Sequence, residues 1–204
     1  ATPDQMMQGL LKKKELDATI LPARYHGFPL PVPRGKWSGE WEVNLIKKPK
    51  KTSPVKHMKK LLDSEKRFLV FVPNIDWMVK WETILNEIFS EKKFESVYSS
   101  DEQRKKKVLK MRNKELDFLL TTTILERGVT FPNIDVLVIG AEDRTFTESA
   151  LVQISGRVGR SPKFPTGEVT FYHHGWTKEM KRAIKQIKMM NQLARSRNLL
   201  KERL

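Results

Sequence analysis

The chain has 204 residues and carries 39 lysines and arginines against 24 aspartates and glutamates, which gives a formal charge of +15. It contains no cysteine, which excludes a disulfide framework and a thiolate metal site, and it shows neither an apolar run long enough to span a bilayer nor a signal-peptide pattern. The excess of positive charge predicts attraction to polyanions, with nucleic acid as the first candidate and an acidic membrane surface as the second.

The first 55 residues differ in composition from the rest of the chain. They hold seven of its eleven prolines, at positions 3, 22, 29, 31, 33, 49 and 54. Proline at this density predicts irregular or extended backbone. Trp37 and Trp41 lie close to basic residues here. These rings either pack the segment onto a neighbouring domain or stack on nucleic-acid bases while the cations hold phosphates.

Two further features of this segment have ordinary explanations. His26 is expected to be structural, since no second metal-ligand type stands at a suitable spacing from it. The basic run at residues 47–51 is typical of a solvated linker, with contact to phosphates as the alternative.

From Ser53 onward, segments with helical periodicity alternate with short apolar runs. We expect strands at residues 68–72, 97–98, 118–121, 135–140 and 167–172. We expect helices that start at Ser53, at Ile75, at a Ser100–Gln103 capping box, at a Thr145–Glu148 capping box and at Thr177. The apolar face of the second helix is formed by Ile75, Met78, Val79, Leu85 and Phe89. Strands separated by helices predict an open parallel α/β sheet covered by helices on both faces, with ligands at the carboxyl ends of the strands.

The segment at residues 153–161 carries the most distinctive chemistry. If it continues the preceding helix as far as Pro162, then Gln153, Arg157 and Arg160 lie on one face. Guanidinium groups keep their charge and suit phosphates, and Gly156 lets a large anion come close. The alternative is that the arginines complement a helix C-terminus and remain solvated.

Two segments resemble the motifs of a known enzyme superfamily. Gln-x-x-Gly-Arg-x-Gly-Arg at residues 153–160 resembles motif VI of superfamily 2 helicases, and residues 122–130 resemble motif V at the expected distance before it. Residues 68–73 would correspond to motif IV, and residues 1–3 are similar to the end of motif III, which closes the first motor domain.

The resemblance implies a fold and a division of the chain. It implies a RecA-like parallel sheet sandwiched by helices, as in helicase C-terminal domains, with a Pro-rich N-terminal extension and a long basic C-terminal helix. Residues 1–55 would connect this domain to the first motor domain, and residues 56–204 would form the helicase C-terminal domain itself.

The resemblance also implies roles for single residues. The implied catalytic residues are the arginine finger Arg160, its companion Arg157, and Gln153. On the nucleotide side it implies Gly128, Thr130 and Gly156, although many relatives have an acidic residue at the position of Thr130. Contacts to the DNA backbone are implied for Thr122, Thr123 and Arg127. The cofactors would be ATP and Mg²⁺, bound mainly by the first motor domain, and no metal is expected in this chain.

The chain lacks half of the residues that a nucleoside-triphosphatase needs. No Gly-x-x-x-x-Gly-Lys-Ser/Thr loop occurs in it. Glu142 and Asp143 follow a strand and superficially copy a magnesium-binding motif, but without the phosphate loop we reject that interpretation. Asp101 and Glu102 fit the acidic first turn of a capped helix. The chain is therefore not expected to hydrolyse ATP by itself.

Within the superfamily, several segments are similar to the bacterial late-competence DNA-uptake ATPases. They are residues 21–26, 121–130, 153–161, 165–169 and 187–191. This resemblance implies single-stranded DNA, the first RecA-like domain of the same chain and competence uptake proteins at the inner membrane as partners, and a homo-oligomer as a further option. It also implies a cytoplasmic location at the inner face of the membrane, with zinc only in an N-terminal part beyond this sequence.

Three other functions stay open from the sequence. The first is a helicase of replication restart or recombination, which shares motifs V and VI. The second is a DNA-binding module without motor activity, and the third is a docking domain that uses the C-terminal helix as its contact surface.

Overall fold

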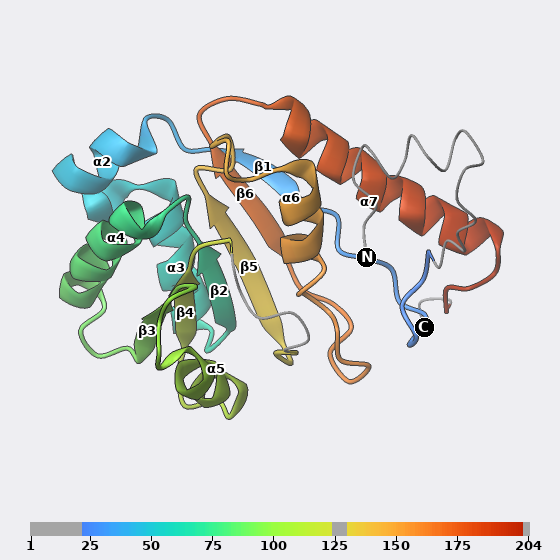
Figure 1. The fold of residues 1–204 in the computed structure, drawn as a ribbon, viewed down its shortest axis with the longest axis horizontal. Helices are drawn as coiled ribbons and strands as arrows, with labels where there is room; N and C mark the ends of the chain where they lie inside the picture. Colours follow the sequence, from blue (N-terminus) through green and yellow to red (C-terminus); the bar gives the residue numbers. More distant parts are fainter. Residues whose placement is uncertain (1–21, 124–129, 202–204) are drawn as a thin grey trace.

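A single parallel sheet organises the molecule. The computed structural model describes residues 22–123 and 130–201. Six strands pair in the order β1-β6-β5-β2-β4-β3, and every pair is parallel (Figure 1). The strands are β1 (Arg34–Trp37), β2 (Arg67–Phe71), β3 (Phe94–Val97), β4 (Phe118–Thr121), β5 (Ile134–Ile139) and β6 (Val169–His173). The predicted parallel α/β sheet is confirmed.

The central strands are buried on both faces, as their continuous apolar runs predict. All six residues of β5 are buried, including Asp135. The carboxylate of Asp135 accepts a hydrogen bond from the backbone N–H of Glu168 at 2.8 Å and lies 3.7 Å from Nζ of Lys66. Burial raises the pKa of Asp135, and these two contacts partly oppose the increase.

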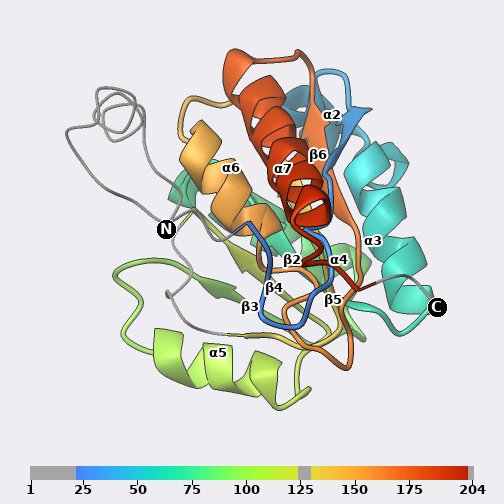
Figure 2. The same ribbon diagram turned by 90° about the vertical axis from the view of Figure 1, so that its right-hand side faces the viewer.

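Helices cover the two faces of the sheet in separate groups (Figures 1 and 2). One apolar core lies beneath α2, α3 and α4, and the other lies beneath α5, α6 and α7. The helices are α2 (Trp41–Lys47), α3 (Ser53–Asp63), α4 (Ile75–Ile88), α5 (Arg104–Arg112), α6 (Glu148–Ser155) and α7 (Lys178–Ser196), with a short 3₁₀ helix η1 (Pro49–Lys51). This three-layer arrangement is the RecA-like sandwich that the sequence predicts.

The helix caps correct two predictions. The Thr145–Glu148 capping box is wrong, because the backbone N–H of Thr145 donates to the Asp143 carboxylate and Thr147 caps α6 instead. The Ser100–Gln103 box is also wrong. There, the side chain of Asp101 accepts from the backbone N–H of Gln103, and α5 begins one residue later. In both places an aspartate competes for the backbone donor that the box requires. The predicted cap of α7 at Thr177 is confirmed, since its hydroxyl accepts from the N–H of Met180.

The inward face of α4 also differs from the prediction. Ile75 and Val79 are 43% and 53% exposed, whereas Met78, Trp81 and Leu85 are buried. These three residues are spaced i, i+3 and i+7, which places them on one helix face. The predicted inward positions Met78, Leu85 and Phe89 are therefore confirmed, whereas Ile75 and Val79 lie on the surface.

The described part of the Pro-rich segment is more ordered than its composition predicts. Residues 22–33 are irregular, but β1 extends the sheet by pairing with β6. Trp41 and Leu45 of α2 are buried in the core, while Trp37 is 66% exposed. Packing therefore accounts for Trp41 and leaves Trp37 on the surface. The similarity of residues 1–3 to motif III lies outside the described residues.

No helix in the described part of the chain combines the length and apolar character that crossing a bilayer requires.

Candidate functional site

A cavity of about 260 Å³ lies at the carboxyl ends of the central strands. It brings together segments that are far apart in the sequence, in the place where parallel sheets bind ligands. Its lining residues are Phe71, Thr123, Thr145, Thr147, Ser149, Ala150, Gln153, Ile154 and Arg157. The structure thus joins Gln153 and Arg157 of the motif VI segment with Thr123 of the motif V segment. No acidic side chain stands among these described lining residues, so they fit an anion better than a cation.

The arginines do not continue helix α6, and the predicted helix to Pro162 is wrong. The helix ends at Ser155, and residues 156–160 form a turn, which we call the arginine turn. Gly159 has φ of +67°, and a Cβ atom at this position would lie 2.2 Å from the carbonyl oxygen of Pro165. Only glycine fits this combination of a left-handed backbone and close packing. Arg157 and Arg160 therefore project from a turn and not from one helix face.

The two predicted catalytic arginines have different surroundings. Arg157 is half-buried and lines the cavity, whereas Arg160 is exposed and is not among the lining residues. Burial, and then the charge of Arg160, lower the pKa of Arg157. The two guanidinium groups are thus close enough to repel each other, and a bound phosphate would offset this repulsion. Gln153 is exposed at the rim, and its amide donates to Oγ of Ser149 at 3.3 Å.

A third arginine, from the opposite end of the chain, holds the backbone of the arginine turn. Nη1 of Arg24 donates to the carbonyl oxygens of Val158 at 2.7 Å and Gly159 at 2.6 Å, and Nη2 donates to that of Gly156 at 3.1 Å. These carbonyls follow the end of α6 and so have no helical partners of their own. Burial, and then the charge of Arg160, lower the pKa of Arg24 to about 10, so it stays charged at neutral pH.

His26 reinforces the same contact, which confirms the structural role predicted for it. Its Nδ1 accepts a hydrogen bond from the backbone N–H of Phe28 at 3.1 Å. In the neutral ring the other nitrogen then carries the proton, and Nε2 donates it to the carbonyl oxygen of Gly159 at 3.0 Å. That oxygen therefore receives hydrogen bonds from both Arg24 and His26. Sequence patterns did not reveal this contact, because 132 or more residues separate the partners.

Only residues 122, 123 and 130 of the motif V segment lie within the described part of the chain. Thr122 is buried, with its carbonyl oxygen accepting from the Thr121 hydroxyl at 3.1 Å, while Thr123 is half-buried and faces the cavity. Thr130 is half-buried but is not among the cavity's lining residues. The predicted contacts at Arg127 and Gly128 lie outside the described residues.

The acidic residues that copy a magnesium site have partners inside the fold. Oε1 of Glu142 accepts from the indole N–H of Trp41 at 3.0 Å and lies 2.7 Å from Nδ1 of His174. Asp143 binds the hydroxyl and N–H of Thr145. In the described part of the chain, no three His, Asp or Glu side chains cluster closely enough to hold a metal ion. Oε1 of Glu142 and the Asp143 carboxylate are thus engaged within the fold, while Oε2 of Glu142 is buried and has no hydrogen-bond partner among the described residues.

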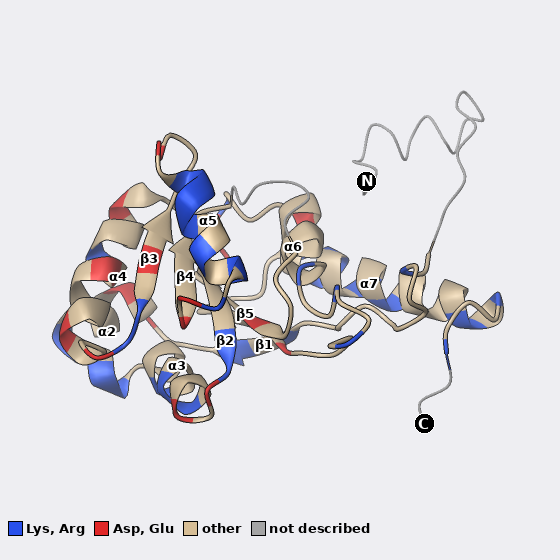
Figure 3. Ribbon diagram, turned by 90° about the horizontal axis from the view of Figure 1, so that it is seen from below, with Lys and Arg blue, Asp and Glu red and all other residues tan. Residues whose placement is uncertain are grey.

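A second, larger cavity is strongly basic but lies elsewhere. It has a volume of about 660 Å³ between the edge strand β1 and helix α3, and it contains no residue of the two motifs. Its cationic lining residues are Arg34, Lys36, Lys51, Lys56 and Lys60. Figure 3 shows that lysines and arginines also follow α5 and α7, so positive charge alone does not single out one site.

Comparison with known proteins extends the resemblance over nearly the whole chain. It is 39% identical over 194 residues to the competence protein ComFA of Bacillus subtilis (strain 168), which covers 95% of this chain and 42% of that protein. The same identity and length hold for ComFA of Streptococcus pneumoniae (strain ATCC BAA-255 / R6), with 45% of that protein covered. The chain thus spans less than half the length of these two relatives.

Two further similarities are shorter or structural. Over 66 residues the chain is 47% identical to the transcription-repair-coupling factor of Staphylococcus aureus (strain USA300), which covers 32% of the chain and 5% of that protein. The fold is similar to that of domain 2 of the DEAD-box helicase Mss116p, solved bound to an RNA duplex. The TM-score is 0.55 at 18% identity, with 76% of this chain and 68% of the other covered.

The family is settled by a match that contains both motif segments. Residues 53–162 match the helicase conserved C-terminal domain, and this range includes the cavity and the arginine turn. The chain belongs to the helicase conserved C-terminal domain family and is similar over 95% of its length to the competence protein ComFA.

Proposed function

We propose that this chain is the second motor domain of an ATP-dependent single-stranded DNA translocase that drives DNA uptake in competence. The observation that carries the proposal is the shared cavity, in which Thr123 of motif V faces Gln153 and Arg157 of motif VI. The similarity to two competence proteins over 95% of the chain supports the biological setting.

In this proposal the arginine turn stabilises negative charge. Arg157 reaches the cavity directly, and Arg160 lies within electrostatic reach of it. ATP, bound with Mg²⁺, would supply the phosphoryl group that is transferred. The two guanidinium groups would stabilise the negative charge that develops on this group, and the Gln153 amide at the rim of the cavity would orient the arginines. The arginines repel each other before an anion is bound. Negative charge that develops on the phosphoryl oxygens in the transition state is therefore stabilised between them.

The other half of the nucleotide site belongs to the first RecA-like domain of the same protein. That domain would provide the phosphate loop and the carboxylate for Mg²⁺, which this sequence does not contain. The 204-residue chain alone is therefore predicted to be inactive. Closure of the two domains around ATP would change how the motif V segment, with the buried Thr122 and the half-buried Thr123, contacts the DNA backbone, and this would move the strand.

The partners and the location follow from the same proposal. Single-stranded DNA is the substrate, and competence uptake proteins at the inner membrane are the protein partners. The chain would lie in the cytoplasm at the inner face of that membrane. A homo-oligomer and a zinc site in the N-terminal part of the longer protein remain compatible with this assignment.

The direct test measures DNA-stimulated ATP hydrolysis by the full-length protein. Arg157→Ala and Arg160→Ala should each lower turnover by about a thousandfold, because each removes a charge that stabilises the transition state. The matched control is Arg182→Ala, which removes an exposed arginine on α7. DNA affinity and thermal stability should stay at the wild-type values in all three variants.

Two outcomes would redirect the assignment. If neither arginine variant lowered turnover, the motor role of the arginine turn would fail, and a DNA-binding or docking module would take its place. If turnover collapsed but cells carrying Arg160→Ala took up DNA normally and recovered poorly from replication damage, a replication-restart helicase would replace the competence translocase.

A further inference from the structure

The segment that grips the arginine turn is itself fixed at two points. We call residues 22–30 the N-terminal strap; it runs past the ends of α6 and α7 (Figure 2). Leu30 exchanges two hydrogen bonds with the side chain of Asn191 on α7, both 2.8 Å long. The backbone N–H of Lys201 donates to the carbonyl oxygen of Gly27 at 2.8 Å. The strap is therefore a fixed support for the arginine turn, anchored on the C-terminal helix and the residues after it.

We propose that Arg24 and His26 are positioning residues that set the orientation of Arg157 and Arg160 toward the reacting phosphate. The inference rests on the proposed function, since it assigns these residues to the site that the arginine turn forms. Neither Arg24 nor His26 lines the cavity, so they act through the backbone of the turn.

The geometry of the hydrogen bonds supports this role. Three carbonyl oxygens within four residues point at one planar guanidinium group, which fixes the direction of the peptide units between them. The Gly159 carbonyl, which belongs to the peptide bond that leads into Arg160, receives one bond from Arg24 and one from His26. A rotation of that peptide would break both bonds at once. The orientation of the peptide between Gly159 and Arg160 sets the position of the Arg160 Cα–Cβ bond. By fixing this peptide, the strap limits the positions that the Arg160 guanidinium can occupy.

The charge on Arg24 adds a second effect. Burial is the main cause of the lowered pKa of Arg24, and the nearby charge of Arg160 lowers it further, so the two guanidinium groups repel each other. Arg160 is thus disfavoured from folding back onto the carbonyls that Arg24 occupies, and is directed away from the strap. A lysine in place of Arg24 would keep this charge but would lack the planar fork of donors that binds three carbonyls.

The test uses full-length protein and steady-state kinetics of DNA-stimulated ATP hydrolysis. Arg24→Ala should lower kcat by about 100-fold, and Arg24→Lys by about 10-fold, since a misplaced catalytic group of this kind costs up to about two orders of magnitude. The KM for ATP and the affinity for single-stranded DNA should change less than about twofold. His26→Ala should fall between the wild type and Arg24→Ala, and Arg182→Lys should match the wild type.

A double-mutant cycle separates positioning from a general loss of structure. When Arg24→Ala is combined with Arg157→Ala and Arg160→Ala, the strap variant should add no further loss, because the groups that it positions are gone. Losses that multiply in the combined variant would overturn the inference. If Arg24→Ala lowers the thermal unfolding temperature strongly, the same cycle with Arg24→Lys decides the question.

The outcomes also separate this inference from the proposed function. If Arg157→Ala and Arg160→Ala abolish turnover while both Arg24 variants keep the wild-type kcat, only the positioning role is wrong. If the variants of Arg157 and Arg160 keep their turnover, the proposed function itself fails and the positioning role fails with it.

Discussion

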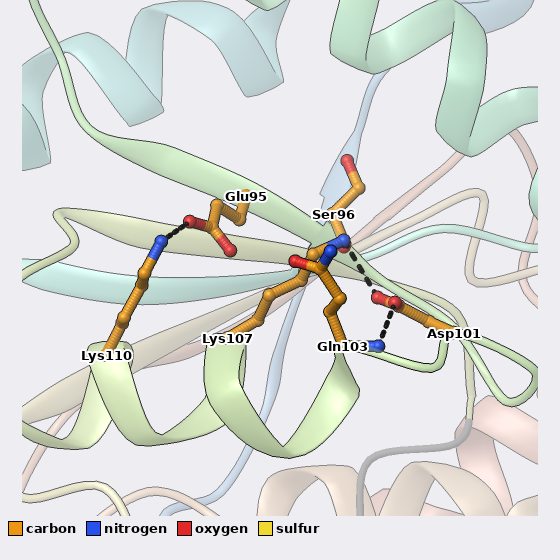
Figure 4. A network of polar contacts seen from close by, with 6 residues as sticks. All are labelled: Glu95, Ser96, Asp101, Gln103, Lys107 and Lys110. Atoms are coloured by element: carbon orange, nitrogen blue, oxygen red, sulfur yellow. Dashed lines mark hydrogen bonds and ion pairs between the residues drawn. The ribbon is translucent and has the colours of Figure 1, made fainter.

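Helix α5 and the arginine turn are both rich in cations, but the cations have different partners. On α5, Nζ of Lys107 lies 2.8 Å from the Asp101 carboxylate and also donates to the carbonyl oxygen of Ser96 at 2.9 Å. Lys110 pairs with Glu95 on β3 (Figure 4). The charges of these two lysines are balanced by carboxylates, and the ion pairs connect the helix to β3 and to the loop after β3.

The arginine turn and the strap show a different arrangement. Arg24 donates to three backbone carbonyls of the turn. Burial, and then the charge of Arg160, lower the pKa of both Arg24 and Arg157, so these guanidinium groups would gain from a bound phosphate. The formal charge of +15 does not locate the functional site, because lysines that are paired with carboxylates carry part of it.

The largest expected effect comes from the backbone of the arginine turn. Gly159→Ala places a Cβ atom 2.2 Å from the Pro165 carbonyl oxygen on a residue with positive φ. Strain and overpacking together should lower the free energy of unfolding by about 3 kcal/mol. Urea denaturation of the 204-residue chain measures this. Gly175→Ala is the matched control, because its Cβ would meet nothing within 4 Å, and it should cost less than about 0.5 kcal/mol. Equal stability of the two variants would contradict the described turn.

Arg67 tests how much an arginine stabilises the fold when it donates hydrogen bonds to backbone carbonyls. Arg67 donates to the carbonyl oxygens of Met111, at the end of α5, and Pro132, both at 2.8 Å. Arg67→Met should lower the free energy of unfolding by about 2 kcal/mol, because two hydrogen bonds from a charged donor are lost at a partly buried site. Hydrogen exchange should show faster opening of the last turn of α5 in this variant. Unchanged exchange there would mean that the Arg67 bonds do not stabilise the end of α5.

A smaller effect is expected for the lysine pairs of α5. Lys107→Met removes the ion pair with Asp101 and the bond to Ser96, and should cost about 1 kcal/mol after allowance for solvent screening. Lys105→Met on the exposed face of the same helix is the control and should be close to neutral. The difference between the two variants should shrink in high salt; a difference that did not respond to salt would argue against an ionic contribution.

The smallest effect concerns the pH dependence of the strap. Burial lowers the pKa of His26, and the charges of Arg24 and Lys201 add to this, while the Gly159 carbonyl opposes it. Below the unfolded pKa of about 6.5 the unfolded chain binds more protons at this site than the folded chain, so stability rises with pH there. The contribution is complete above about pH 6.5 and is lost as the pH falls toward the lowered pKa.

This pH effect can be isolated by one substitution. His26→Gln should lose less stability than the wild type when urea denaturation is compared at pH 7.5 and pH 5. The pKa values of His57 and His173 are lowered as well, so both proteins should retain some loss. An equal loss in both would show that His26 titrates alike in the folded and unfolded chains.

The sequence revealed most of the fold because its strands are continuous apolar runs. Such runs predicted β2, β4 and β5, and the alternation of strands with helices predicted that they pair in parallel. β1 could not be predicted in this way, because Arg34–Trp37 is an exposed edge strand with no apolar run. Its place in the sheet follows from pairing with β6, which lies more than 130 residues later.

Part of the candidate site follows from the sequence, but its geometry does not. The structure places Gln153, Arg157 and Thr123 on one cavity, although the resemblance implied a DNA-backbone contact for Thr123 and a nucleotide contact for the other two. The pattern of apolar residues predicts neither the positive φ of Gly159 nor the hydrogen bonds from Arg24 to the carbonyls of the arginine turn. Two glycines disfavour a helix in this segment, and the hydrogen bonds from Arg24 hold the carbonyls of the turn, so the backbone leaves the helix after Ser155.

The central claim is that the arginine turn binds charge that appears only as the phosphoryl group is transferred. The most direct measurement compares the affinity of the full-length protein, with DNA present, for ADP–aluminium fluoride and for ADP alone. Arg157→Ala and Arg160→Ala should weaken binding of the transition-state mimic by about 100-fold or more and leave ADP affinity nearly unchanged. Equal affinity of the wild type and both variants for the mimic would contradict the claim.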